Sequence, residues 1–163
     1  AIKDNEARGF SYEAADASVA MLVLRRQGQY RPLFELIDYM VTVEHRDQRG
    51  TFAEASVKVR VQGEVLHTVA EGDGPVNAMD RALRKALLPV YPDAAHLKLA
   101  DYKVRILDGN KATEATTRVL IDTTDGERTW TTVGVGTNVI EASWEALYDA
   151  YRWGLTKRAV PVG

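Results

Sequence analysis

Asp38-Tyr39-Met40-Val41 is followed 63 positions later by Asp101-Tyr102-Lys103-Val104, and this repetition decides the fold. Further along, Thr68-Val69 returns as Thr132-Val133, now 64 positions apart, so the second copy has gained one residue. The same spacing relates Gly72 to Gly136, Ala78 to Ala142, and Ala82-Leu83 to Ala146-Leu147. We infer an internal duplication, in which each copy carries three strands, a glycine-containing turn and an amphipathic helix.

The strands of the first copy are indicated by alternation. Residues 53–62 alternate small or apolar side chains with polar ones, the pattern of a strand with one buried and one solvated face. Gln62-Gly63-Glu64 predicts a tight hairpin, and Pro75 suits the first position of a helix, where its missing N–H group would have no partner. The three strands are expected at 34–45, 53–62 and 65–71. The helix is expected to bury Val76, Met79, Leu83 and Leu87.

The second copy repeats this order. Asp125-Gly126 predicts a hairpin turn, and Asn138 suits the N-cap of the last helix, with Glu141 three residues later completing a capping box. That helix is expected to run to about Gly154. The strands are expected at 100–107, 115–123 and 128–135. The buried stripe of the helix is expected to be Val139, Ala142, Ala146, Leu147 and Tyr151.

A helix also precedes the first copy. Ser11 can cap it, Arg25 and Arg26 complement the dipole at its end, and Gly28 terminates it. Its apolar positions, at spacings of three and four, are Tyr12, Ala15, Val19, Leu22 and Val23.

We therefore predict an α+β fold of two pseudo-symmetric β-β-β-α units, packed as one domain and preceded by an N-terminal helix. The predicted boundaries are 1–32 for the helical arm, 33–155 for the domain and 156–163 for a tail. Within the domain, the two repeats are expected at 33–92 and 98–155.

Composition excludes several classes of protein. The net charge of −2 and the pI near 6.0 argue against a nucleic-acid partner, which favours a basic face. Zero cysteines exclude disulfides and thiolate sites and fit a reducing cytosol. No apolar run approaches the roughly 18 residues that span a bilayer, and no secretory signal is present. We expect a cytoplasmic protein. Because the chain starts without methionine, we interpret it as a piece of a longer one.

The residues that could carry catalysis are sparse. His45, His67 and His96 are scattered without metal-binding spacing, and no acidic cluster suggests a metal ion. The chain contains neither a phosphate-binding loop nor a dinucleotide-binding fingerprint. We predict no catalytic residue, no metal site and no cofactor in this chain.

The two strand-to-helix turns are the better candidates for binding. Gly72-Asp73-Gly74 and Gly136-Thr137-Asn138 each place unpaired N–H groups at a helix N-terminus, which suits a carboxylate. Asp73 can cap its helix or meet an ammonium group. The structural alternative stays open, because any turn from strand to helix favours glycine or a capping residue.

Residues 64–83 and 99–147 resemble a known family, the C-terminal regulatory domain of 2-isopropylmalate and citramalate synthases. The resemblance is carried by Glu64 to Leu83, by Asp101 to Gly109, and by Trp130 to Trp144. Residues 9–18 are similar to the helix that precedes this domain in the citramalate branch.

The resemblance implies a homodimer that binds the pathway's end-product amino acid and inhibits a separate catalytic barrel. The effector would be isoleucine in the citramalate branch and leucine in the isopropylmalate branch; isoleucine is favoured. The parent is expected to be an acyltransferase that uses acetyl-CoA and a divalent metal, and this chain alone is expected to be inert. The effector residues that the resemblance and the turns suggest are Gly72, Asp73, Gly74, Val76, Leu99, Tyr102, Ile106, Thr113, Thr116, Gly136 and Asn138.

Three alternatives remain. The order helix, three strands, helix is that of a double-stranded RNA-binding domain, but the helix after Asp73 carries Asp80 where phosphates would need basic residues. A dimerisation module without a ligand is a second alternative. A self-contained enzyme is a third and predicts turnover by this chain alone.

Overall fold

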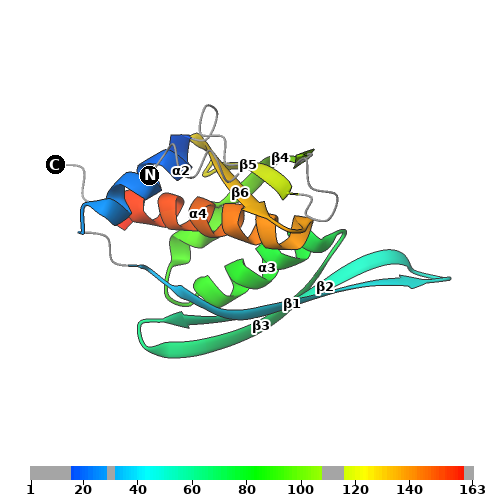
Figure 1. Cartoon of the computed structure of the whole chain (residues 1–163). Helices are drawn as coiled ribbons and strands as arrows, with labels where there is room; N and C mark the ends of the chain where they lie inside the picture. Colours follow the sequence, from blue (N-terminus) through cyan, green and yellow to red (C-terminus); the bar gives the residue numbers. More distant parts are fainter. Residues whose placement is uncertain (1–15, 29–31, 108–115, 160–163) are drawn as a thin grey trace. The chain divides into compact units, whose positions relative to one another are not determined.

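The computed structural model describes residues 16–28, 32–107 and 116–159 (Figure 1). The chain divides into two compact units, Pro32–Ala95 and a second one formed by Ala1–Arg31 with His96–Gly163. Each unit holds one three-stranded sheet and the helix that follows it, which confirms the α+β fold of two β-β-β-α repeats.

The first unit contains an antiparallel sheet in the order β1-β2-β3, with β1 at Glu35–Arg46, β2 at Gly50–Val61 and β3 at Glu64–Gly72. Helix α3, Pro75–Leu87, covers one face. The alternation predicted for β2 is confirmed, since every second side chain from Ala53 to Val61 is buried. Gln62 and Gly63 turn the hairpin with φ of 50° and 83°, the two positive values of a type I′ turn.

The buried face of α3 includes three of the four predicted side chains. Met79, Leu83 and Leu87 are fully buried, whereas Val76 in the first turn is half-buried. Small side chains of the same face, Ala78, Ala82 and Ala86, are buried too and let the helix approach the sheet.

The second unit repeats the arrangement with β4 at Lys98–Leu107, β5 at Thr116–Thr124 and β6 at Thr129–Gly136, in the order β4-β5-β6. Helix α4, Val139–Ala159, packs on β5 and β6, and helix α2, Asp16–Arg26, packs on β6 and α4 (Figure 1). A short 3-10 helix, η1, at Pro92–His96 precedes β4.

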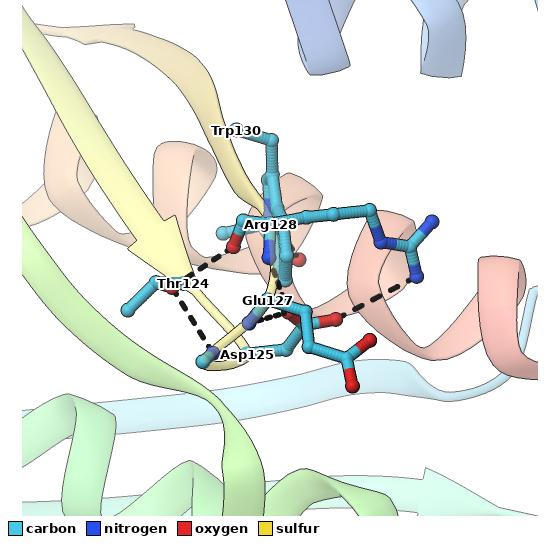
Figure 2. A network of polar contacts seen from close by, with 7 residues as sticks. Thr124, Asp125, Glu127, Arg128 and Trp130 are labelled. Carbon is cyan, nitrogen blue, oxygen red and sulfur yellow. Dashed lines mark hydrogen bonds and ion pairs between the residues drawn. The ribbon is translucent and has the colours of Figure 1, made fainter.

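The predicted turn at Asp125-Gly126 is confirmed by a network of polar contacts (Figure 2). The Asp125 carboxylate accepts hydrogen bonds from the N–H groups of Glu127 and Arg128, at 3.0 and 2.8 Å. The Thr124 hydroxyl accepts from Gly126 N and donates to the Arg128 carbonyl. Gly126 supplies a φ of 94°, which glycine adopts without strain.

The described part of the predicted N-terminal helix is confirmed, but its apolar positions are not its most buried ones. The side chains that the structure buries are Ala17, Ser18 and Met21, whereas Val23 is 45% exposed and Val19 and Leu22 are intermediate. The reason is that α2 packs on β6 with the face that carries Ser18, whose hydroxyl accepts a hydrogen bond from Val133 N at the edge of that strand. Ser11, Tyr12 and Ala15 lie outside the described residues.

Helix α4 continues five residues past its predicted end at Gly154. A Cβ atom at Gly154 would lie 2.7 Å from the Trp130 ring, so this glycine makes room for the tryptophan rather than ending the helix. The indole N–H of Trp130 donates to the Ala150 carbonyl one turn earlier.

Candidate functional site

The turn between β3 and α3 contains two glycines with different reasons to be glycine. A Cβ atom at Gly72 would lie 2.5 Å from the N atom of Ala78, so close packing requires its absence. Gly74 has an extended φ of −152°, and a Cβ atom there would meet nothing within 4 Å. Neither strain nor crowding within the described residues explains glycine at position 74.

The N-terminus of α3 is open. No described side chain caps Gly74, and the first turn carries no acidic residue. Pro75 has no N–H group, and Ala78 N bonds to the Gly74 carbonyl. The N–H groups of Val76 and Asn77 are therefore the ones that a carboxylate could meet. Exposed Asp73 lies beside them, and its own N–H donates to Asn77 Oδ1 at 3.2 Å.

The equivalent turn before α4 is filled by its own side chains. Asn138 Oδ1 accepts from Glu141 N at 2.9 Å, which confirms the predicted N-cap. The Glu141 carboxylate returns to the N–H and hydroxyl of Thr137, one residue before the expected partner. Gly136 is required by packing, because a Cβ atom there would lie 2.9 Å from Ala142 N. This turn therefore has fewer N–H groups available for an anion than the turn before α3.

In the second unit, strand β4 carries three of the predicted effector residues, Leu99, Tyr102 and Ile106. Tyr102 is half-buried, and its hydroxyl lies 3.1 Å from that of Ser143 on α4. Ile106 is 64% exposed, and Val104 on the same side of the strand is 43% exposed. The chain bulges between Leu99 and Asp101, as β1 does between its equivalents Leu36 and Asp38.

The register of β5 separates Thr116 from this group. Thr116 pairs with Leu107, whereas Thr117 pairs with Ile106 and shares its face of the sheet. The sequence did not identify Thr117, because which of two successive residues of β5 faces the same side as Ile106 depends on the pairing register of β5 with β4. Thr113 lies outside the described residues. The predicted residues of the first turn and those of β4 belong to different units.

Two carboxyl groups of α4 escaped prediction as well, half-buried Glu145 and buried Asp149. Burial raises the pKa of Glu145 to about 7, against a hydrogen bond from Val135 N and the charge of Arg25, while Asp149 and Glu141 raise it further. Burial also raises the pKa of Asp149, although Arg25, Arg152 and Ser18 act to lower it. Their spacing of four on one helix face was the signal available.

Other features of the described residues offer little chemistry. No group of three or more His, Asp or Glu side chains is placed to hold a metal ion in the part that the structure describes. A hollow of about 160 Å³ is lined by charged residues of β1, β2, β3 and the β1–β2 turn, together with Thr42 and Phe52. Another, of about 140 Å³, is lined in part by Asp101, Lys103 and Asp122. Neither hollow is lined by a predicted effector residue. No described helix has the length and apolar character to cross a membrane.

Comparison with known proteins agrees with this architecture. A family model described as the LeuA allosteric (dimerisation) domain matches residues 13–154. The chain belongs to this family.

Its curated relatives include citramalate synthases. The (R)-citramalate synthase of Streptomyces coelicolor is 51% identical over 98% of this chain, and that of Geobacter sulfurreducens is 46% identical over 96%. A 2-isopropylmalate synthase of Aquifex aeolicus is 33% identical over 64% of the chain and 18% of its own length. The chain spans about 30% of the two citramalate synthases.

Proposed function

We propose that this LeuA-type domain binds a branched-chain amino acid, with isoleucine favoured, as a feedback inhibitor. We further propose that it dimerises and controls a catalytic barrel of a citramalate or 2-isopropylmalate synthase in the same protein. The acetyl-CoA and divalent metal of such an acyltransferase would be held by that barrel.

The difference between the two strand-to-helix turns carries this proposal. The turn before α4 is occupied by Asn138, Thr137 and Glu141, whereas the N-terminus of α3 has no side-chain cap among the described residues. A carboxylate is the ligand that such a terminus favours, through both its N–H groups and the helix dipole. Gly74 leaves the approach clear.

The remaining groups of an amino acid have candidates too. Asp73 is exposed beside the α3 terminus and suits an ammonium group. Val76 in the first turn is half-buried and offers apolar surface. Leu99, Tyr102 and Ile106 of β4 belong to the other unit and stay predictions that the family resemblance implies.

Isoleucine is favoured over leucine by the pattern of identity. The chain is 46–51% identical to the citramalate synthases above and 33% identical to the isopropylmalate synthase. The two amino acids differ in the position of one methyl group, a difference worth about 1–3 kcal/mol in a fitted pocket.

Calorimetric titration with isoleucine, leucine and valine tests the proposal. We expect isoleucine to bind most tightly, Asp73→Ala to weaken binding, and Gly74→Ala to weaken it without loss of stability. The matched control is Asp93→Ala, which changes an exposed carboxylate on η1. Absence of heat and of a thermal shift with all three amino acids at millimolar concentration would overturn the proposal.

A module that only dimerises is the second candidate. The exposed apolar side chains Val104 and Ile106 on β4 support a contact between subunits, since apolar patches of this kind often mark interfaces. Sedimentation of the wild type and of Ile106→Lys tests whether this surface forms the dimer contact. A dimer that binds no amino acid in the calorimetric titration would support the module that only dimerises.

A further inference from the structure

Helix α2 covers one flank of the second unit, made of the edge of β6 and the neighbouring side of α4. Ser18 of α2 is 4% exposed, and its hydroxyl accepts a hydrogen bond from Val133 N of β6 at 2.9 Å. Arg25 of α2 forms an ion pair with Asp149 of α4. Val133 and Asp149 are both buried. A helix of complementary charge therefore closes this flank.

The first unit has the equivalent flank, 64 positions earlier in the sequence, with much of it exposed. Val69 of β3 corresponds to buried Val133 and is 43% exposed. Val69 pairs with Ser56 as Val133 pairs with Leu120, so its N–H group points away from β2 as that of Val133 points away from β5. Leu88, at the end of α3, is 36% exposed. No helix of the described residues covers this flank as α2 covers the other.

The two flanks carry opposite charges at equivalent positions. Arg81 and Lys85 of α3 correspond to Glu145 and Asp149 of α4, 64 positions later. The acidic pair of α4 is met by a cation of α2, Arg25. A helix that meets the basic pair of α3 is therefore expected to carry carboxylates, since complementary charges favour a partner and like charges exclude it.

Both cations of α3 lie at the edge of β3. Arg81 donates to the Glu71 carbonyl and Lys85 to the Val69 carbonyl, each at 3.2 Å. Both side chains are exposed, and neither forms an ion pair with a carboxylate of the described residues. The acidic residue of α3, Asp80, pairs instead with Arg84 at 2.9 Å. We call the surface formed by Val69, Arg81, Lys85 and Leu88 the basic flank.

We propose that the basic flank binds an acidic amphipathic helix from a part of the longer protein outside this chain. A hydroxyl of that helix accepts from Val69 N, its carboxylates pair with the two cations of α3, and its apolar side chains cover Leu88. The chain spans only about 30% of its citramalate synthase relatives, which leaves ample sequence for such a helix. Helix α2 of a second copy does not fit, because Arg25 and Arg26 would face cations. This inference rests on the proposed function only for the presence of a further part of the protein, and it does not use the amino-acid site.

A helical peptide copied from α2 tests the basic flank. The probe is residues 16–26 with Arg25→Glu and Arg26→Glu, stapled between positions 19 and 23 because 11 residues are too short to stay helical alone. We expect this acidic peptide to bind the chain and to shift the NMR amide signal of Val69. The same stapled peptide with both arginines retained is the matched control and should leave the Val69 signal unchanged.

Reversal of charge on the basic flank should exchange these preferences. The double variant Arg81→Glu and Lys85→Glu should bind the acidic peptide about tenfold more weakly, since each reversed charge loses an exposed ion pair and adds a repulsion. It should instead bind the arginine-containing peptide at Val69. Lys98→Glu changes an exposed lysine of β4 and should bind the acidic peptide like the wild type. If circular dichroism shows that the double variant is unfolded, Arg81→Gln and Lys85→Gln carry the test.

The source of the helix is tested in the complete protein. There the Lys85 amine should react with acetic anhydride more slowly than in this chain alone, because the helix covers it. An unshifted Val69 signal with the acidic peptide, undiminished binding by the charge-reversed variant, or equal reactivity of Lys85 in both proteins would overturn the proposal. Protection of Lys85 that rises with the concentration of this chain would overturn it in favour of a second copy. None of these results alters the amino-acid titration, so failure here is distinct from failure of the proposed function.

Discussion

The hydroxyl of Thr132 on β6 donates a hydrogen bond to the backbone carbonyl of Ala146 on α4, 2.8 Å away. Thr68 on β3 makes the equivalent bond to Ala82 on α3 at 2.6 Å. Both partners of each bond belong to segments that the sequence repeats 64 positions apart. The duplication thus preserved a specific bond between the last strand and the helix of each unit, as well as the order of elements.

Replacement of Thr132 by valine tests the contribution of this bond. Valine keeps the shape and removes the donor, and we expect a loss of about 1 kcal/mol in the free energy of unfolding. Thr68→Val should cost a similar amount or less, because Thr68 is only partly buried. Urea unfolding measures both. Equal stability of Thr132→Val and the wild type would contradict a stabilising role.

Gly134→Ala should be strongly destabilising. A Cβ atom there would lie 1.9 Å from the Ala142 carbonyl oxygen, so α4 would have to move away from β6. Overpacking of this kind typically costs about 1–3 kcal/mol or more. The equivalent residue of the first repeat is Ala70, so α3 tolerates the methyl group that α4 does not. Gly74→Ala is the matched control and should unfold at the wild-type urea concentration; a similar loss in both variants would contradict this interpretation.

Asp125→Ala should weaken the β5–β6 hairpin. Its carboxylate accepts from two backbone N–H groups and lies 3.6 Å from Arg128 Nη2 (Figure 2). Loss of such a turn acceptor should cost about 1–2 kcal/mol of unfolding free energy, since two N–H groups lose their partner. Glu127→Ala removes an exposed carboxylate from the same turn and should be nearly neutral. Thermal unfolding compares the two variants.

Local patterns predicted most of the fold because the relevant physics is local. Alternation located β2, the Gln62-Gly63 turn located its hairpin, and Pro75 located the start of α3. The buried face of α2 escaped because periodicity of apolar residues cannot identify the partner. That partner is a strand edge with a free N–H group at Val133 and a carboxylate at Asp149, and Ser18 satisfies both across more than a hundred residues.

Some features of the candidate site were predicted and others were not, for a similar reason. The cap at Asn138 follows from residues three positions apart and is confirmed. Whether Thr116 or Thr117 shares a face with Ile106 depends on the register between β4 and β5, which no residue of either strand specifies alone. Half-buried Glu145 and buried Asp149 were overlooked because burial of one helix face is set by α2, β6 and α4 together.

Glu145 should make stability depend on pH. Burial raises its pKa to about 7 in the folded protein, whereas an unfolded glutamate titrates near its ordinary value of about 4.3. Between these pH values the folded state retains a proton that the unfolded state has lost, so the free energy of unfolding falls as the pH rises toward 7. The raised pKa of Asp149 acts in the same direction.

Urea unfolding from pH 4.5 to 8 tests this dependence. The free energy of unfolding should decline less with pH in Glu145→Gln than in the wild type, while the exposed control Glu64→Gln keeps the wild-type slope. Parallel curves for Glu145→Gln and the wild type would show that this carboxyl group is not the source of the dependence.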